Sequence, residues 1–175
     1  MVVWTRRFNL YLALAAAVAL LCGCQMFRPK GPEGALRVHL QTNPGPENTS
    51  QTISVMRSNP VLVIISHDPI LTEANLVAAK IIDAPGGFAI EIQFDENGSW
   101  LLEQYSSANP GAHFAIFGQW GDQLANGRWL AAPLITHRIA NGVLAFTPDA
   151  SREEADQLVL GLNHAAAENQ KGQLK

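Results

Sequence analysis

The chain has 175 residues with a formal net charge of −3, and 47 % of its residues are apolar. Its 12 Lys and Arg are outnumbered by 15 Asp and Glu, so it lacks the basic excess that binding to nucleic acid phosphates requires. Its two cysteines, Cys22 and Cys24, both lie near the N-terminus. The rest of the chain therefore has no disulfide, thiol nucleophile or thiolate ligand, and its fold must be stabilised by an apolar core.

Residues 1–24 have the pattern of a bacterial lipoprotein export signal. Two arginines precede an apolar run at residues 10–21, which has the length of a secretory signal and is too short to cross a bilayer core about 30 Å thick. Leu21, Gly23 and Cys24 then resemble a lipobox, which predicts cleavage before Cys24 and acylation of its thiol. The alternative is an ordinary signal peptide or an uncleaved anchor with two incidental cysteines.

The signal predicts that the mature chain lies in the cell envelope, on the periplasmic or outer side of a membrane. Residues 1–23 form the signal peptide, and residues 24–35 form a lipidated tether rich in proline and glycine. In Gram-negative lipoproteins an Asp after the acylated cysteine commonly marks inner-membrane retention. By this resemblance, Gln25 favours the outer membrane.

Residues 36–168 are predicted to form one α+β domain, and this domain begins with strands. Residues 36–40 alternate apolar and polar side chains, which is typical of a strand with one buried face, and residues 52–57 form a second strand. Residues 61–66 are apolar almost throughout, which predicts a central strand covered on both faces.

The middle of the domain is predicted to contain two short helices separated by a strand. Thr72 caps the first helix, which continues to residue 82. Residues 88–94 alternate strictly and form an amphipathic strand. Residues 99–107 form the second helix, with Trp100 packed inward.

The second half of the domain is predicted to hold three strands, at residues 114–120, 129–135 and 143–147. A long loop at residues 121–128 joins the first two. Ser151 and Glu154 form a capping box that begins the final helix, and residues 169–175 form a disordered tail. Together the elements predict a mainly antiparallel sheet with about three helices packed on it.

The order of elements in residues 59–162 resembles the head of the first periplasmic domain of SecD, the export-translocase subunit. The shared motifs are Pro-Ile-Leu-Thr at 69–72, Asn-Pro-Gly at 109–111, Ala-Pro-Leu-Ile at 132–135 and Glu-Glu-Ala at 153–155. These are turns, caps and core positions and include no catalytic set. The resemblance implies the fold and a tendency to contact extended polypeptide. It does not carry over the energy coupling of SecD, whose membrane helices have no counterpart after residue 21.

Three further groups of residues are candidate ligand sites. Trp120 and Trp129 flank one loop and form either an exposed platform for a peptide or glycan, or a cross-strand pair that closes the core. His67 and Asp68 end a strand, but they lack the third ligand of a metal site, so a structural turn is the alternative. Residues 95–98 weakly resemble a calcium loop, and a plain turn is favoured.

These observations predict a non-catalytic binding module without a cofactor or bound metal, which contacts envelope or exported proteins. No nucleophile elbow or phosphate-binding loop supports an enzyme. Two alternatives stay open. One is an envelope hydrolase or metal-dependent enzyme that uses His67 and Asp68, and the other is a structural component of an envelope complex.

Overall fold

The computed structural model describes residues 31–45 and 49–173. The predicted signal peptide and the acylated Cys24 lie outside the described residues. Gly31–Lys175 forms one compact unit, and every strand pairing described in it is antiparallel. The α+β prediction is confirmed, but the described residues form two α-helices and not about three. Neither of these helices is long and apolar enough to cross a bilayer.

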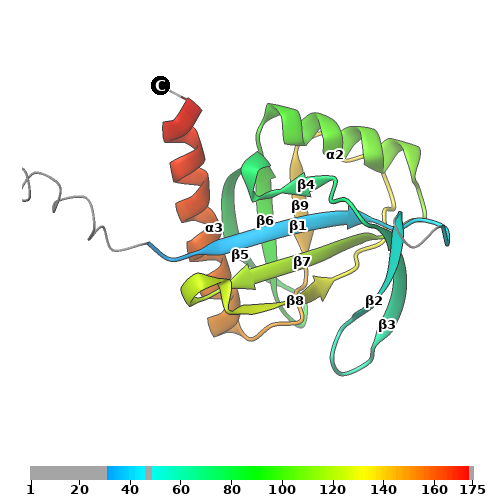
Figure 1. Ribbon diagram of the computed structural model, residues 1–175, viewed down its shortest axis with the longest axis horizontal. Coiled ribbons are helices and arrows are strands. Elements are labelled where there is room, and N and C mark those ends of the chain that lie inside the picture. The colour runs from blue at the N-terminus through cyan, green and yellow to red at the C-terminus, as the bar shows by residue number, and fades with distance from the viewer. Residues whose placement is uncertain (1–30, 46–48, 174–175) are drawn as a thin grey trace, which may run out of the picture. The chain divides into compact units, whose positions relative to one another are not determined.

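Two sheets lie face to face (Figure 1). The first has the strand order β4-β1-β7-β8, with β4 (Leu71–Thr72), β1 (Gly34–Leu40), β7 (Phe114–Trp120) and β8 (Asn126–Ala131). The second has the order β5-β6-β9, with β5 (Leu76–Ala84), β6 (Gly87–Phe94) and β9 (Val143–Phe146). In Figure 1 the strands of the first sheet run across the view, and those of the second run up and down behind them.

The main core fills the space between these sheets. Alternate residues of β1 and β7 face it, because side chains on a strand alternate between its two faces. The largest fully buried side chains of the core are Leu36, Val38, Leu71, Ile90, Ile92, Leu102, Phe114, Ile116, Leu130, Leu158 and Leu162. The strands predicted at 36–40, 88–94 and 114–120 are therefore confirmed, each with one face in this core.

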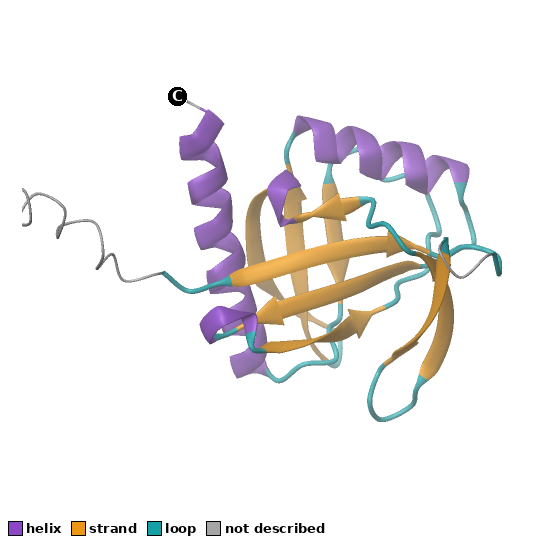
Figure 2. Cartoon of the chain, in the orientation of Figure 1, coloured by secondary structure: helices purple, strands orange, loops and turns teal. Residues whose placement is uncertain are grey.

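The helices α2 (Glu96–Ala108) and α3 (Arg152–Gln173) cover two sides of the sheets, as Figure 2 shows. α3 packs on β5 and β1, and a Cβ atom at Gly161 would lie 2.5 Å from the backbone of Glu33, so glycine is needed for this close approach. Ser151 and Glu154 form the predicted capping box, with reciprocal bonds of 3.2 and 2.8 Å.

A two-stranded hairpin packs on the other face of the first sheet. It consists of β2 (Ser50–Val55) and β3 (Val61–Ser66), and its inward side chains form a second apolar cluster with Ala115 and Trp129. The prediction that residues 61–66 form a central strand is wrong. Val63 and Ile65 are buried, but the other face is uncovered and Leu62 is 73 % exposed.

The predicted helix at residues 72–82 is also wrong. Thr72 does cap a helical turn, the 3₁₀ segment Glu73–Asn75, but β5 follows at once. Leu76 and Ala79 are both buried because a β-bulge inserts Val77 between them. The bulge turns the period of two into a spacing of three, which is the spacing of one face of a helix.

Three further boundaries and one burial differ from prediction. α2 begins at Glu96 and not at residue 99, because Asp95 accepts a bond from the N–H of Gly98 at 2.7 Å and caps the helix. β8 starts at Asn126 and ends at Ala131, so it takes residues from the predicted loop and ends before the proline. Trp100 is exposed and not packed inward. The predicted tail is wrong from 169 to 173, which belong to α3.

Candidate functional site

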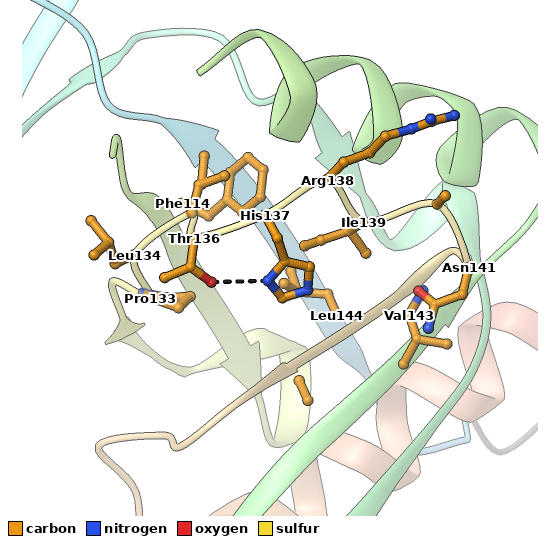
Figure 3. A pocket seen from close by; sticks show the side chains of 13 residues that line it. Phe114, Pro133, Leu134, Thr136, His137, Arg138, Ile139, Asn141, Val143 and Leu144 are labelled. Carbon is orange, nitrogen blue, oxygen red and sulfur yellow. Dashed lines mark hydrogen bonds between the residues drawn. The ribbon is translucent and has the colours of Figure 1, made fainter. Parts of the chain in front are cut away.

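A cavity of about 610 Å³ lies between the start of β7, the segment after β8 and β9. One wall is the segment that follows β8, which pairs with the start of β7. The N–H of Phe114 donates to the carbonyl of Pro133 at 3.0 Å, and the N–H of Ile135 donates to that of Ala112 at 2.8 Å. The other wall is β9 (Figure 3).

The edge of β9 that faces away from β6 has no strand partner in the described part of the chain. The carbonyl of Gly142 accepts a bond from the N–H of Phe94 at 3.0 Å. This bond shows which residues of β9 direct their backbone groups toward β6, namely Leu144 and Phe146. Backbone groups alternate between the two sides of an antiparallel strand, so those of Val143 and Ala145 point away from β6. The N–H of Val143 donates to Oδ1 of Asn141 at 3.1 Å. The carbonyls of both residues and the N–H of Ala145 are left to pair with another strand.

The opposite edge of this sheet is blocked near its middle. The side chain of Asn163 on α3 accepts a bond from the N–H of Ala79 and donates one to its carbonyl, both at 2.8 Å. These two bonds occupy the outward backbone groups at the middle of β5. On β5, alternation leaves further outward backbone groups at Ile81 and Asp83. On β9, the outward backbone groups lie next to the cavity.

The loop at residues 135–141 forms the rim of the cavity. His137 lies near the centre of Figure 3 and is hydrogen-bonded to the hydroxyl of Thr136 at 2.9 Å. Arg138 points the other way, toward α2, where it contacts the carboxylate of Glu103. As expected for polar residues of a loop, His137 and Arg138 are exposed.

A second cavity of about 300 Å³ continues along β9. It shares Pro133 with the first cavity and is bounded by Phe146 of β9 and by the hairpin residues Met56 and Val61, which are 48 % and 46 % exposed. The hairpin tip is held here by Arg57, whose N–H donates to the carboxylate of Asp149 at 2.8 Å. We call the two cavities together the β9 groove.

The structure does not bring the two predicted indoles together. Trp120 is 2 % exposed and belongs to the main core, where the guanidinium of Arg128 stacks on its ring at 4.9 Å. Trp129 is opposite Phe117 in the ladder, on the other face of the sheet, and packs edge-on against Phe117 and His39. They form neither a shared platform nor a cross-strand pair.

His67 and Asp68 lie in solvent after β3. Their side chains are 62 % and 97 % exposed, with 3.7 Å between Nδ1 and Oδ1. Within the described residues, no group of three His, Cys, Asp or Glu side chains is arranged to hold a metal ion. Asp95 acts as a helix cap, so the weak calcium-loop pattern belongs to a helix start. None of these residues lines the β9 groove.

Comparison with known proteins places this fold in a family. The sequence pattern of the SecDF P1 head subdomain matches residues 50–167, which is more than half of the chain. The chain belongs to the SecDF P1 head family. The resemblance noted in the sequence is thereby confirmed, and both cavities of the β9 groove lie within the matched residues of this P1 head.

Two solved structures share the P1 head fold. One is SecDF, described as a membrane component that enhances protein export, with a TM-score of 0.51 and 20 % identity over 76 % of this chain and 63 % of that one. The other is a crystal structure of SecDF in a super-membrane-facing form, with a TM-score of 0.52 and 20 % identity over 76 % and 19 %. This chain thus spans less than two thirds of the SecDF chains that it matches. No curated protein matches it.

One histidine of this P1 head is buried between β1 and the hairpin. His39 is 5 % exposed, and its Nδ1 donates to the carbonyl of Ser66 at 2.9 Å. Burial lowers the pKa of His39 below its usual 6.5, and the positive charge of Arg37 acts in the same direction, although the bond to Ser66 opposes it.

The stability of the domain should therefore fall as the pH is lowered through 6.5. The unfolded chain takes up a proton on His39 at this pH, whereas the folded chain does so only at lower pH, so protonation favours unfolding. Urea unfolding of wild type and His39→Asn at pH 7.5 and at pH 5.5 measures the difference. An equal pH dependence in both proteins would contradict the prediction.

Proposed function

We propose that this chain is a non-catalytic binding module of the cell envelope that contacts exported polypeptide by strand addition to β9. The outward carbonyls of Val143 and Ala145 and the outward N–H of Ala145, beside the β9 groove, carry this proposal. An extended peptide would pair with them, because an unpaired strand edge is a template for another strand. Its alternate side chains would enter the two cavities.

The chemistry of the groove fits an unfolded segment. Its hairpin side presents Met56 and Val61, and its floor is formed by Phe114 and Leu144, which are buried apolar residues. Main-chain pairing does not depend on the peptide sequence, and apolar cavities accept the residues that a folded protein would bury. Family membership supports a role in protein export, since a SecDF structure is described as enhancing export.

We further propose that an acylated Cys24 holds the module at a membrane, with the outer membrane favoured by Gln25. This rests on the export signal alone. Two acyl chains or more keep a protein bound stably, so the groove would stay near the membrane across which polypeptides emerge. Mass spectrometry of the purified chain tests it, and an unmodified Cys24 contradicts it.

Replacing Ala145 with proline tests the strand addition. Proline removes the outward N–H of Ala145 while leaving the bonds to β6 unchanged, because position 145 does not donate to that strand. Binding of a fluorescent peptide of alternating valine and serine to the full chain should weaken about tenfold, by loss of one main-chain bond and by the clash of the ring with the incoming strand.

The matched control is Ala145→Ser, which keeps the N–H and should bind the peptide as the wild type does. Unfolding curves for both variants establish that the fold is intact. Equal peptide binding by the proline and serine variants would contradict strand addition at β9.

The alternative of a metal-dependent enzyme gains no support from the structure. His67 and Asp68, its candidate residues, are exposed and line neither cavity of the β9 groove.

A further inference from the structure

Trp100 is a large apolar side chain that the fold leaves in solvent. It lies on the outer face of α2 and is 59 % exposed. Gln104 and Ser107 follow it at intervals of four and seven residues, so the three side chains form one stripe of the helix. Together with Glu103 and Arg138 they line a shallow cavity of about 190 Å³.

This cavity has a rigid polar wall. Arg138 comes from the loop at residues 135–141 and contacts the carboxylate of Glu103 on α2. The same loop is fixed to α2 a second time, by the N–H of Ile139, which donates to the hydroxyl of the buried Ser106 at 2.9 Å. Glu103 and Arg138 are thus paired beside Trp100 before any ligand binds.

We propose that this site, formed by Trp100, Glu103, Gln104, Ser107 and Arg138, binds a pyranose ring of the cell-wall glycan. A pyranose has a flat face of C–H groups that stacks on an indole, and a rim of hydroxyl groups that need donors and acceptors. Trp100 supplies the aromatic face, Gln104 supplies both kinds of hydrogen-bonding group, and Glu103 accepts. The cavity is smaller than the roughly 300–1,000 Å³ of sites for drug-sized ligands and suits one ring.

The surroundings of Trp100 favour a neutral sugar over other ligands. Protein anchors lie in apolar, well-packed surroundings, whereas every other side chain that lines this cavity is polar. The charges of Glu103 and Arg138 neutralise each other, so the site has no excess positive charge for the phosphates of a lipid headgroup. The N-acetylated glycan of peptidoglycan is an envelope polymer built of such rings, and naming it rests on the envelope location in the proposed function. The site is separate from the β9 groove, so the two proposals can fail independently.

Co-sedimentation with purified peptidoglycan tests the proposal. The full chain is used in a detergent without a sugar headgroup, and free tetra-N-acetylchitotetraose is added as competitor. We expect the wild type to sediment, Trp100→Ala to bind at least about tenfold more weakly, and the tetrasaccharide to release the wild type. Trp100→Tyr, which keeps an aromatic face, should recover part of the binding.

Leu160→Ala is the matched control, because Leu160 is 60 % exposed on α3, outside this cavity. It should sediment as the wild type does. The proposal is overturned by a wild type that does not sediment, or by Trp100→Ala sedimenting equally well. It is also overturned if the tetrasaccharide fails to compete, since the contact would then be with the stem peptides and not with the sugar.

Discussion

Replacing Trp120 with alanine should lower the free energy of unfolding by about 3–5 kcal/mol. The indole is 2 % exposed and fills the core between the first sheet and α3, so its removal leaves a cavity that the surrounding strands cannot close. The substitution also removes the ring on which Arg128 stacks, although the contact of Arg128 with Glu154 persists. Urea unfolding followed by circular dichroism measures the loss.

The other tryptophans of the domain provide matched controls for Trp120. Trp129 is half-buried in the smaller cluster under the hairpin, so Trp129→Ala should cost less. Trp100 is exposed on α2, and Trp100→Ala should change the free energy of unfolding by no more than about 0.5 kcal/mol. A similar loss for all three variants would contradict the assignment of Trp120 to the core.

The sequence pattern could identify these aromatic residues but not the face on which each one lies. Trp120 and Trp129 flank a loop between two strands, and these strands do pair as a hairpin. The face of the sheet on which each ring lies depends on the register of that pairing. Trp129 is opposite Phe117 and Trp120 is opposite Asn126. This places the two rings on opposite faces, because side chains alternate along a strand. Position within a hairpin therefore does not establish that two side chains meet.

Strands with strict alternation were predictable because one face of each is buried in the same core. The predictions for β3 and β5 were wrong for the same reason, which is that the spacing of apolar residues does not show what the neighbouring strands do. In β3 the apolar run predicts a strand that is covered on both faces, but Leu62 is exposed. In β5 the bulge at Val77 produced a helical spacing. A bulge and an uncovered face both depend on the neighbouring strand, which local sequence does not contain.

The β9 groove was not predictable from the chain alone. Its walls come from β9, the segment after β8 and the tip of the β2–β3 hairpin, which are brought together by pairings between distant residues. The only local signal is Pro133, because a proline has no N–H to donate to a strand ladder. It ends the ladder of β8 and is shared by both cavities. A proline that ends a strand next to an unpaired edge is a sequence signal for such a groove.

The open edge of β9 is the better site for strand addition if the opposite edge of the sheet is blocked. An unprotected edge strand invites pairing with any other chain, and two such edges in one sheet would favour aggregation. Asn163 closes β5 with two bonds to one residue, which satisfies both outward groups of Ala79. The fold thus blocks the β5 edge at Ala79 and leaves β9 open, where the cavities can accept side chains.

Replacing Asn163 with alanine should therefore have two separable effects. The free energy of unfolding should fall by about 2–6 kcal/mol, because the N–H and carbonyl of Ala79 lose their partners and each orphaned group costs about 1–3 kcal/mol. The freed edge of β5 should also exchange its amide hydrogens faster and promote aggregation, while peptide binding at β9 stays unchanged. Hydrogen exchange, light scattering and the peptide assay measure these effects.

Asn169→Ala is the control for this prediction, because Asn169 lies on the same helix and donates a single bond of 3.2 Å to the carbonyl of Glu73. It should cost less stability and leave β5 protected. If Asn163→Ala unfolds no more easily than Asn169→Ala and its Ala79 amide stays slow to exchange, then packing of α3 alone protects β5. In that case the bonds of Asn163 would not explain why β5 is blocked and β9 is open. Strand addition would then have to be tested at both edges of the sheet.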